Sequence, residues 1–356
     1  MSKLRTAIIF GGTSSEHEVS VMSAISVLTN LSKEKYDIFP VIITKSGRWL
    51  LYKGELDDVN KSDFDNNSIY IPAITSPDRT VKGLLVSPDN APSYTQQIDV
   101  AFPVLHGKYG EDGTIQGLFA LAGIPYVGAD TLSSAICMDK EITNRLLDFA
   151  GIARAPWGVI HRTDTGNIDS FIEKWERTFG YPMFVKPANA GSSVGVSKVR
   201  DKEALKTAIE VALTHDTKAI IEKSITGREI ECAVIGNDSP EASVLSEIYP
   251  VNEFYDYDSK YNTPSRTALP ADLSPSVSNN IRETAVKAYS LLGCSGFARV
   301  DFFVEENSGD ILLNELNTIP GFTTISMYPK MMEASGLPYD KLLDRLMELA
   351  LERAKA

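Results

Sequence analysis

Residues 299–327 decide the fold of this chain and read RVDFFVEENSGDILLNELNTIPGFTTISM. Within them, the apolar runs 300–304 and 311–316 flank the polar residues Asn-Ser-Gly at 307–309. Two such runs separated by a short glycine-containing segment are typical of a β-hairpin. The stretch therefore predicts two paired antiparallel strands near the C-terminus.

Two carboxylates and an amide fall on one face of this predicted hairpin. Side chains alternate along a strand, so Arg299 and Asp301 share a face, as do Glu315 and Asn317. If the loop has three residues with Gly309 left-handed, Asp301 lies opposite Glu315, whereas a slip of one residue separates them. Carboxylates placed side by side in an apolar sheet repel unless a cation lies between them, and such oxygen donors suit Mg2+. A solvated face of an ordinary hairpin is the alternative.

The composition limits the class of protein. The 356 residues are 43% hydrophobic and 23% charged, which is typical of a soluble chain with two or three domains. A net charge of −12 disfavours a general binder of nucleic acid or of anionic membranes. No apolar run approaches the ~18 residues of a membrane span, and no signal-peptide pattern is present. Three widely spaced cysteines form neither a disulfide framework nor a zinc motif, so we expect a cytoplasmic protein.

Strands and helices alternate along the rest of the chain and predict three domains. The apolar run 6–10, a helical segment and the strand 36–44 form a βαβ unit, which is typical of a parallel sheet. We expect an α/β domain at residues 1–128, followed by α+β domains at 129–222 and 223–356. The predicted fold class is therefore α/β and α+β.

Two loops of the first domain bear candidate ligand-binding residues. Gly11 and Gly12 follow the first strand without the Gly-x-Gly-x-x-Gly pattern of a dinucleotide site, so they indicate close approach of a small ligand or only a tight turn. Glu16 opens the next helix, where a carboxylate either complements the helix dipole or binds a ligand ammonium. His106 follows a buried strand, at the carboxyl end where ligands collect in α/β sheets, although a lone histidine is usually structural.

The second domain shows signs of phosphate and adenine binding. The small-residue loop 190–195 (AGSSVG) can direct backbone N–H groups and hydroxyls at phosphates, or it is a flexible connection. Lys186 ends the strand just before this loop and Lys140 begins a helix, so two lysines would supply positive charge. The strand end at Glu222 can offer backbone groups to an adenine, with Glu229 accepting from ribose hydroxyls.

The polar loop 252–270 of the last domain is rich in aromatic residues. It contains Phe254, Tyr255, Tyr257 and Tyr261. Buried aromatic side chains normally lie in periodic elements, so several of them in a loop suggest a lid that closes on a ligand. Local packing against the last domain is the alternative.

Several segments in a fixed order carry a resemblance to a known family; they are 11–20 (GGTSSEHEVS), 106–107 (HG), 110–113 (GEDG), 138–140 (MDK), 191–195 (GSSVG), the aromatic loop 254–261 and 314–323 (NELNTIPGFT). The chain resembles the D-alanine–D-alanine ligases of the ATP-grasp superfamily over nearly its whole length, most weakly over 54–100 and 160–180. The resemblance implies the ATP-grasp fold in three domains, in which a Rossmann-like N-terminal domain precedes a central and a C-terminal ATP-grasp subdomain. It also implies a homodimer that uses ATP, two Mg2+ or Mn2+ ions and two D-alanine molecules, with a monovalent cation as a further candidate cofactor.

The same resemblance assigns site residues position by position. The ATP-binding set comprises Lys140, Lys186, Glu222, Lys223, Ile225, Glu229, Phe254, Lys260 and Asn314. The metal ligands comprise Asp301, Glu315 and Asn317. The catalytic set comprises Glu16, Ser192, Tyr261, Arg299, Gly321 and Ser326, and the substrate-binding set comprises His106 and Met327.

The resemblance also implies roles for the catalytic set. Glu16 would bind the ammonium group of the first D-alanine and, with Ser192 and Tyr261, would tether the closed lid. Arg299 and the N–H of Gly321 would stabilise the oxyanion of a tetrahedral intermediate.

Three alternatives remain open. Relatives that make D-alanyl-D-lactate or D-alanyl-D-serine tend to carry Arg at the position of Met327, so this methionine favours D-alanine as the second substrate over D-serine or D-lactate. The chain could instead be another ATP-grasp ligase that joins a different carboxylate and amine. A non-catalytic nucleotide-binding or oxidoreductase module is disfavoured by the missing Gly-x-Gly-x-x-Gly, and it gives no purpose to Asp301, Glu315 and Asn317.

Overall fold

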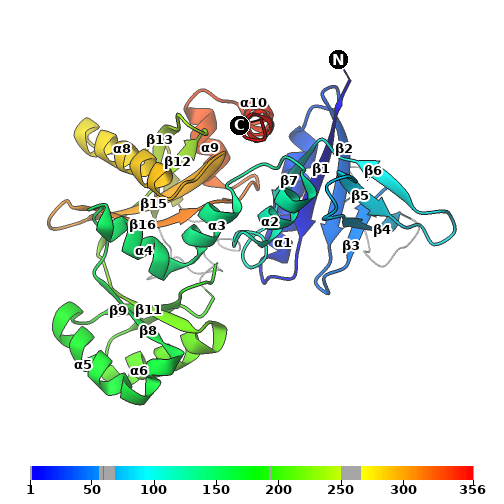
Figure 1. Cartoon of the computed structure of the whole chain (residues 1–356). Coiled ribbons are helices and arrows are strands. Elements are labelled where there is room, and N and C mark those ends of the chain that lie inside the picture. Colours follow the sequence, from blue (N-terminus) through cyan, green and yellow to red (C-terminus); the bar gives the residue numbers. More distant parts are fainter. Residues whose placement is uncertain (1, 56–58, 60–68, 192–193, 250–265, 356) are drawn as a thin grey trace.

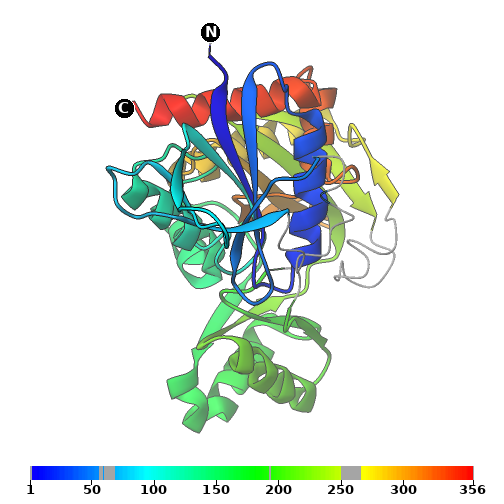
Figure 2. The same cartoon turned by 90° about the vertical axis from the view of Figure 1, so that its right-hand side faces the viewer.

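The computed structural model describes residues 2–55, 59, 69–191, 194–249 and 266–355, and it contains three β-sheets that follow one another along the chain (Figure 1). Figure 2, turned by 90°, shows the second sheet set apart from the other two. None of the helices in these ranges has the length and apolar character that crossing a bilayer demands.

The first sheet has seven strands in the order β6-β5-β4-β3-β2-β1-β7. β1 runs parallel to β2 and β7, as the predicted βαβ unit requires, whereas β2 to β6 pair antiparallel in sequence. Its elements are β1 Leu4–Gly11, α1 His17–Asn30, β2 Tyr36–Ile43, β3 Trp49–Tyr52, β4 Tyr70–Thr75, β5 Gly83–Val86, β6 Tyr94–Gln97, β7 Val100–Val104 and α2 Thr114–Ala122.

Strand β1 is apolar because both of its faces are buried. Ile8 and Phe10 belong to a core shared with α1, whereas Ile9 belongs to a second core beneath α2. The strand ends at Gly11, which has a φ of 88°, and a Cβ there would lie 2.3 Å from the carbonyl oxygen of Ile43. Only glycine therefore allows the chain to turn from β1 toward α1.

The second sheet has four antiparallel strands in the order β10-β9-β11-β8. Val185 and Ile221 point into a core formed with the two helices of this region. Because side chains alternate along a strand, Lys186 and Glu222 point to the opposite face. The elements are β8 Trp157–His161, α5 Ile168–Phe179, β9 Met183–Pro187, β10 Ser197–Val199, α6 Lys202–His215 and β11 Lys218–Lys223.

The third sheet has five strands in the order β14-β13-β12-β15-β16, and helices cover both of its faces. On one face, α8 packs with α3 and α4; on the other, α9 and α10 share a core with the first sheet. The elements are α3 Thr131–Met138, α4 Lys140–Phe149, β12 Gly227–Ile235, β13 Glu241–Tyr249, β14 Arg266–Ala268, α8 Pro275–Leu291, β15 Phe297–Glu305, β16 Ile311–Asn317, α9 Met327–Ala334 and α10 Tyr339–Arg353.

Strands β15 and β16 form the predicted hairpin, and Asp301 does lie opposite Glu315. The predicted three-residue loop is wrong, because the N–H of Glu305 donates to the carbonyl of Asp310 and leaves the four residues 306–309 in the loop. A β-bulge at Asn314 then shifts the register by one residue and restores the expected pairing. The bulge also lets Leu313 and Leu316 both enter the core beneath α8.

The predicted polar loop at 252–270 is wrong in its last part, because residues 266–268 form β14 and pair with β13. Residues 250–265 lie outside the described residues. The domain limits at 128 and 222 stay a prediction. Apart from Lys223 at the end of β11, each sheet falls within one predicted domain, but α3 and α4, from the predicted middle domain, pack on the third sheet.

Candidate active site

A cavity of about 630 Å3 lies where the three sheets meet, and its volume is in the usual range for small-molecule sites. It gathers every predicted site residue that the structure describes: Glu16, His106, Lys140, Lys186, Glu222, Lys223, Ile225, Glu229, Arg299, Asp301, Asn314, Glu315, Asn317, Gly321, Ser326 and Met327. Four further predicted residues, Ser192, Phe254, Lys260 and Tyr261, lie outside the described residues.

The floor of the cavity is the polar face of the hairpin. Arg299 donates from Nε and Nη2 to the two carboxylate oxygens of Asp301, both at 2.7 Å, and Asn317 Nδ2 donates to Asp301 at 3.0 Å. Glu231 on β12 lies opposite Asp301, with its Oε1 3.2 Å from Arg299 Nε. Burial by itself lowers the pKa of the Arg299 guanidinium, but the carboxylates of Asp301 and Glu231 outweigh burial and raise this pKa well above its usual range.

The predicted metal ligands are therefore adjacent on this floor, with two carboxylates and one amide. Among the described residues, no group of three or more His, Cys, Asp or Glu side chains is arranged to hold a metal ion. Asp301 and Glu315 contribute only two such groups, and the third ligand, Asn317, is an amide. The metal site stays a prediction.

Cationic side chains line the cavity wall that the second sheet contributes. Lys186 Nζ lies 2.7 Å from Glu222 Oε2, and both side chains are mostly buried. Lys140, the first residue of α4, donates from Nζ to the carbonyl of Ala190 at 2.8 Å and from its backbone N–H to Ala188 at 3.1 Å. Both lysines thus flank the small-residue loop that the sequence predicted to bind phosphate.

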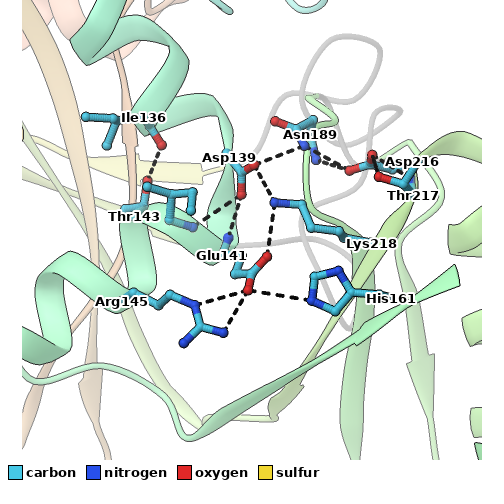
Figure 3. A network of polar contacts seen from close by, with 11 residues as sticks. Ile136, Asp139, Glu141, Thr143, Arg145, His161, Asn189, Asp216, Thr217 and Lys218 are labelled. Atoms are coloured by element: carbon cyan, nitrogen blue, oxygen red, sulfur yellow. Dashed lines mark hydrogen bonds and ion pairs between the residues drawn. The ribbon is translucent and has the colours of Figure 1, made fainter. Parts of the chain in front are cut away.

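An ionic network behind Lys140 connects α4 to the second sheet (Figure 3). Asp139 caps α4 by accepting from the N–H groups of Glu141 and Ile142, and its Oδ2 lies 2.5 Å from Lys218 Nζ. Lys218 also lies 3.1 Å from Glu141 Oε2. Asn189 donates to Asp139 at 3.4 Å from the base of the small-residue loop.

The charges of this network stabilise one another. Burial opposes ionisation of Glu141, but hydrogen bonds from Arg145 and Lys218 outweigh burial and lower the pKa of its carboxyl. Burial likewise lowers the pKa of the Lys218 ammonium, and the bonds to Asp139 and Glu141 more than reverse this effect and raise the pKa.

Glu16 enters the cavity from the start of α1. Its side chain is buried and makes no capping hydrogen bond to the first turn of α1. The interpretation of Glu16 as a helix cap therefore has no hydrogen bond to support it. A Cβ at Gly107 would lie 2.3 Å from Glu16 Oε2, and a Cβ at Gly191 would lie 2.9 Å from it. Loops from the first and second sheets therefore meet at this carboxylate.

His106 is buried beside the same place. Its Nδ1 lies 3.1 Å from the carbonyl oxygen of Ile319 and 3.7 Å from Glu111 Oε1, and its Nε2 lies 3.1 Å from Ser23 Oγ. Burial alone lowers the pKa of the imidazole, but the interactions with Glu111 outweigh it and raise this pKa. Both ring nitrogens thus already contact protein atoms.

The segment after the hairpin closes the far end of the cavity. Ser326 directly precedes α9, and its Oγ accepts from the N–H of Thr323 at 3.0 Å rather than from the first turn of that helix. A Cβ at Gly321 would lie 2.7 Å from this oxygen, so a side chain there would force the Ser326 hydroxyl to shift. Met327 follows as a buried residue of α9 that also lines the cavity.

Several lining residues escaped sequence reasoning: Glu111, Phe184, Lys198, Glu231 and Lys330. Phe184 lies two residues before Lys186 on β9, so strand alternation would have placed it on the same face. Glu111 belongs to the GEDG segment that follows His106. Glu231 gave no local signal, because only the pairing of β12 with β15 brings it to Arg299.

Comparisons with known proteins agree with this geometry. The family model described as D-ala D-ala ligase N-terminus matches residues 5–129, and the one described as D-ala D-ala ligase C-terminus matches residues 146–348. A D-alanine–D-alanine ligase from Caldicellulosiruptor bescii is 49% identical over 355 residues, covering 99% of this chain and 96% of that protein.

Solved structures give the same result. The VanG D-Ala:D-Ser ligase from Enterococcus faecalis has a TM-score of 0.88 and 43% identity, over 98% of this chain and all of that one. The D-alanine–D-alanine ligase from Coxiella burnetii has a TM-score of 0.86 and 37% identity, over all of this chain and 96% of that one.

The three-sheet fold and its cavity thus define a ligase with the ATP-grasp fold, as the sequence predicted. Within that class, the chain belongs to the D-alanine–D-alanine ligase family.

Proposed function

We propose that this enzyme joins two D-alanine molecules into D-alanyl-D-alanine at the expense of ATP, for peptidoglycan precursor synthesis. The observation that carries the proposal is the convergence of three kinds of group on one cavity. Lys140 and Lys186 can bind phosphates through their positive charge. Asp301 and Glu315 can bind a cation, and Glu16 can bind the ammonium group of an amino acid. Membership of the ligase family supports the use of ATP.

In the proposed reaction, the carboxylate of the first D-alanine attacks the γ-phosphorus of ATP, which gives an acyl phosphate and ADP. The amine of the second D-alanine then attacks the acyl carbon and loses a proton, and inorganic phosphate leaves. Arg299 and the N–H of Gly321 stabilise the oxyanion of the tetrahedral intermediate. Glu16 holds the ammonium of the first substrate, and Ser192 and Tyr261 complete the lid that excludes water from the acyl phosphate.

The residues on the hairpin floor fit Mg2+ or Mn2+. Asp301 and Glu315 are directly opposed across the strand pair, and Asn317 adds an amide oxygen, so the donors are all hard oxygen atoms. When bound, such ions would offset the charge of the transferring phosphoryl group. Arg299 places its positive charge beside these ligands, because its guanidinium makes a bidentate contact with the carboxylate of Asp301.

The second substrate is proposed to be D-alanine, with D-serine as the alternative. Met327, in place of the arginine expected of D-lactate and D-serine ligases, supports D-alanine. The similarity to the VanG D-Ala:D-Ser ligase, at 43% identity, is the reason that D-serine is retained as the alternative second substrate.

Release of inorganic phosphate with ATP and Mg2+ tests the proposal. D-Alanine would be compared with L-alanine, with D-alanine plus D-serine and with D-alanine plus D-lactate, and mass spectrometry would identify each product. We expect release with D-alanine alone and a dipeptide of two D-alanines. No release that depends on D-alanine would refute the proposed function, and a mixed product formed faster than the dialanine would favour the alternative.

We also propose a cytoplasmic homodimer that two divalent ions activate and a monovalent cation assists. Sedimentation analysis would report the dimer, and turnover after chelation and re-addition of Mg2+, Mn2+ or K+ would report the ions.

A further inference from the structure

Helix α1 carries a row of buried serines that no proposed role has used. Ser20, Ser23 and Ser26 follow one another at intervals of three residues, so they lie on one side of the helix. Ser20 Oγ accepts from the N–H of Gly11 and donates to the carbonyl of Val104, which ties α1 to the ends of β1 and β7. The other two serines reach a different part of the chain.

Ser23 takes part in a closed hydrogen-bonded circuit with the segment 319–322. The N–H of Phe322 donates to Ser23 Oγ at 3.2 Å, Ser23 Oγ lies 3.1 Å from His106 Nε2, and His106 Nδ1 lies 3.1 Å from the carbonyl oxygen of Ile319. Ser23 and Phe322 are fully buried, and His106 is 4% exposed. Both ends of the circuit thus hold the same segment, which contains Gly321.

The direction of these bonds follows from the groups involved. Nδ1 of His106 faces a carbonyl oxygen and the carboxylate of Glu111, which only accept, so Nδ1 carries a proton. The Phe322 N–H can only donate, so Ser23 Oγ accepts from it. In the neutral imidazole, the Ser23 hydroxyl then donates to Nε2, and each polar group in the circuit has a partner.

Ser26 holds the other side of the same peptide segment. Tyr339 donates its hydroxyl proton to the carbonyl of Phe322 at 3.1 Å, so the Ser26 hydroxyl, 3.0 Å from the tyrosine oxygen, must be the donor in that contact. The backbone N–H and C=O of Phe322 are therefore both connected to α1, through Ser23 directly and through Ser26 and Tyr339.

We propose that Ser23 and Ser26 are positioning residues, which fix the segment 319–322 and so hold the Gly321 N–H at a set place relative to Glu16. Together with His106 and Tyr339 they form a hydrogen-bonded brace for this segment. The proposal rests on the proposed function, in which Gly321 stabilises the oxyanion and Glu16 binds the first substrate. Glu16 directly precedes the same helix that bears the serines, so one rigid element sets the spacing of both groups. His106 belongs to this brace because its two ring nitrogens contact Ser23 and the carbonyl oxygen of Ile319.

Ser23→Ala tests the brace. It leaves the buried N–H of Phe322 without its acceptor, and we expect kcat to fall about 5- to 100-fold with an unchanged KM for ATP. Hydrogen exchange at the Phe322 amide should accelerate in the variant. Ser23→Thr keeps the hydroxyl and should restore both properties, and Tyr339→Phe should lower kcat without exposing the Phe322 N–H.

Ser134→Ala is the matched control. Ser134 is a fully buried helical serine whose Oγ has no hydrogen-bond partner in the described part of the chain, so its removal should leave kcat and exchange unchanged. Unaltered protection of the Phe322 amide in Ser23→Ala would overturn the brace. Lost protection with an unaltered kcat would overturn the positioning role. If the unsubstituted enzyme shows no D-alanine-dependent phosphate release, the proposed function fails, and the exchange rates still decide whether the brace exists.

Discussion

Replacing Lys218 by methionine should weaken ATP binding from a position outside the cavity. Lys218 is the only cation within 4 Å of Asp139 among the described residues, and it also pairs with Glu141 (Figure 3). Asp139 in turn caps α4 immediately before Lys140, and Asn189 leads into the loop predicted to bind phosphate. Methionine keeps much of the side-chain length and removes the charge.

The size of the effect follows from what remains after the substitution. Lys218, Asp139 and Glu141 are 14%, 18% and 8% exposed, so both ion pairs are mostly buried. Breaking a buried pair by removing one partner costs about 3–5 kcal/mol. Asp139 keeps its two backbone donors and Glu141 keeps Arg145 at 2.8 Å, so we expect about 2–3 kcal/mol in the free energy of unfolding.

Urea unfolding and steady-state kinetics with saturating D-alanine would measure the two consequences. If about 1–2 kcal/mol of the loss falls on the geometry around Lys140, the KM for ATP rises about 5- to 30-fold. Lys218→Arg should recover part of both effects. Lys202→Met, which removes an exposed 3.9 Å contact with Glu173 in the same region, is the control and should change stability by less than about 1 kcal/mol.

The dependence of the free energy of unfolding on pH, measured at acidic pH, is an independent test of this network. The pKa of Glu141 is lowered in the folded state, so its contribution is present above about pH 4.3 and is lost as the pH falls through the folded pKa. Lys218→Met should make the decline in stability below that pH shallower. A lowered urea midpoint with an unchanged KM for ATP would show that the network is structural only, and no change in either would refute the reasoning.

Three further substitutions test other parts of the site. Glu315→Gln should abolish turnover while the circular dichroism spectrum stays that of the folded enzyme, and normal turnover would disprove the metal assignment. Gly321→Ala brings a Cβ to 2.7 Å from Ser326 Oγ and should cost about 1–3 kcal/mol of transition-state stabilisation, seen as a lower kcat; an unaffected kcat would show that the close contact with Ser326 does not position the Gly321 N–H. Tyr261→Phe should loosen the lid tether and admit D-lactate as second substrate, and an unchanged substrate range would count against the tether.

The hairpin illustrates how far sequence patterns reach. The pairing of Asp301 with Glu315 was predicted, but from a loop that is too short by one residue. The β-bulge at Asn314 compensates for the longer loop. Periodicity cannot reveal such a bulge, because it depends on which leucines the core beneath α8 accepts, and that choice is made by tertiary packing.

Many of the cavity residues were predictable because they lie in motifs of fixed local sequence. The supporting contacts were not predictable in the same way. Lys218 meets Asp139, and Ser23 meets Phe322, only because elements far apart in the chain pack together. Glu231 likewise reaches Arg299 through strand pairing. A local pattern predicted side chains that line the cavity, whereas the partners that orient them follow from the completed fold.

The distribution of apolar cores divides the molecule into two bodies. The first and third sheets share one core through α1, α9 and α10, and the second sheet has a core of its own. A rotation of the second sheet would open the cavity along the boundary between these two bodies. It would not change the positions of Glu16, Gly321 and the serines of α1 relative to one another. The spacing on which the proposed amino-acid site depends would therefore survive such a rotation.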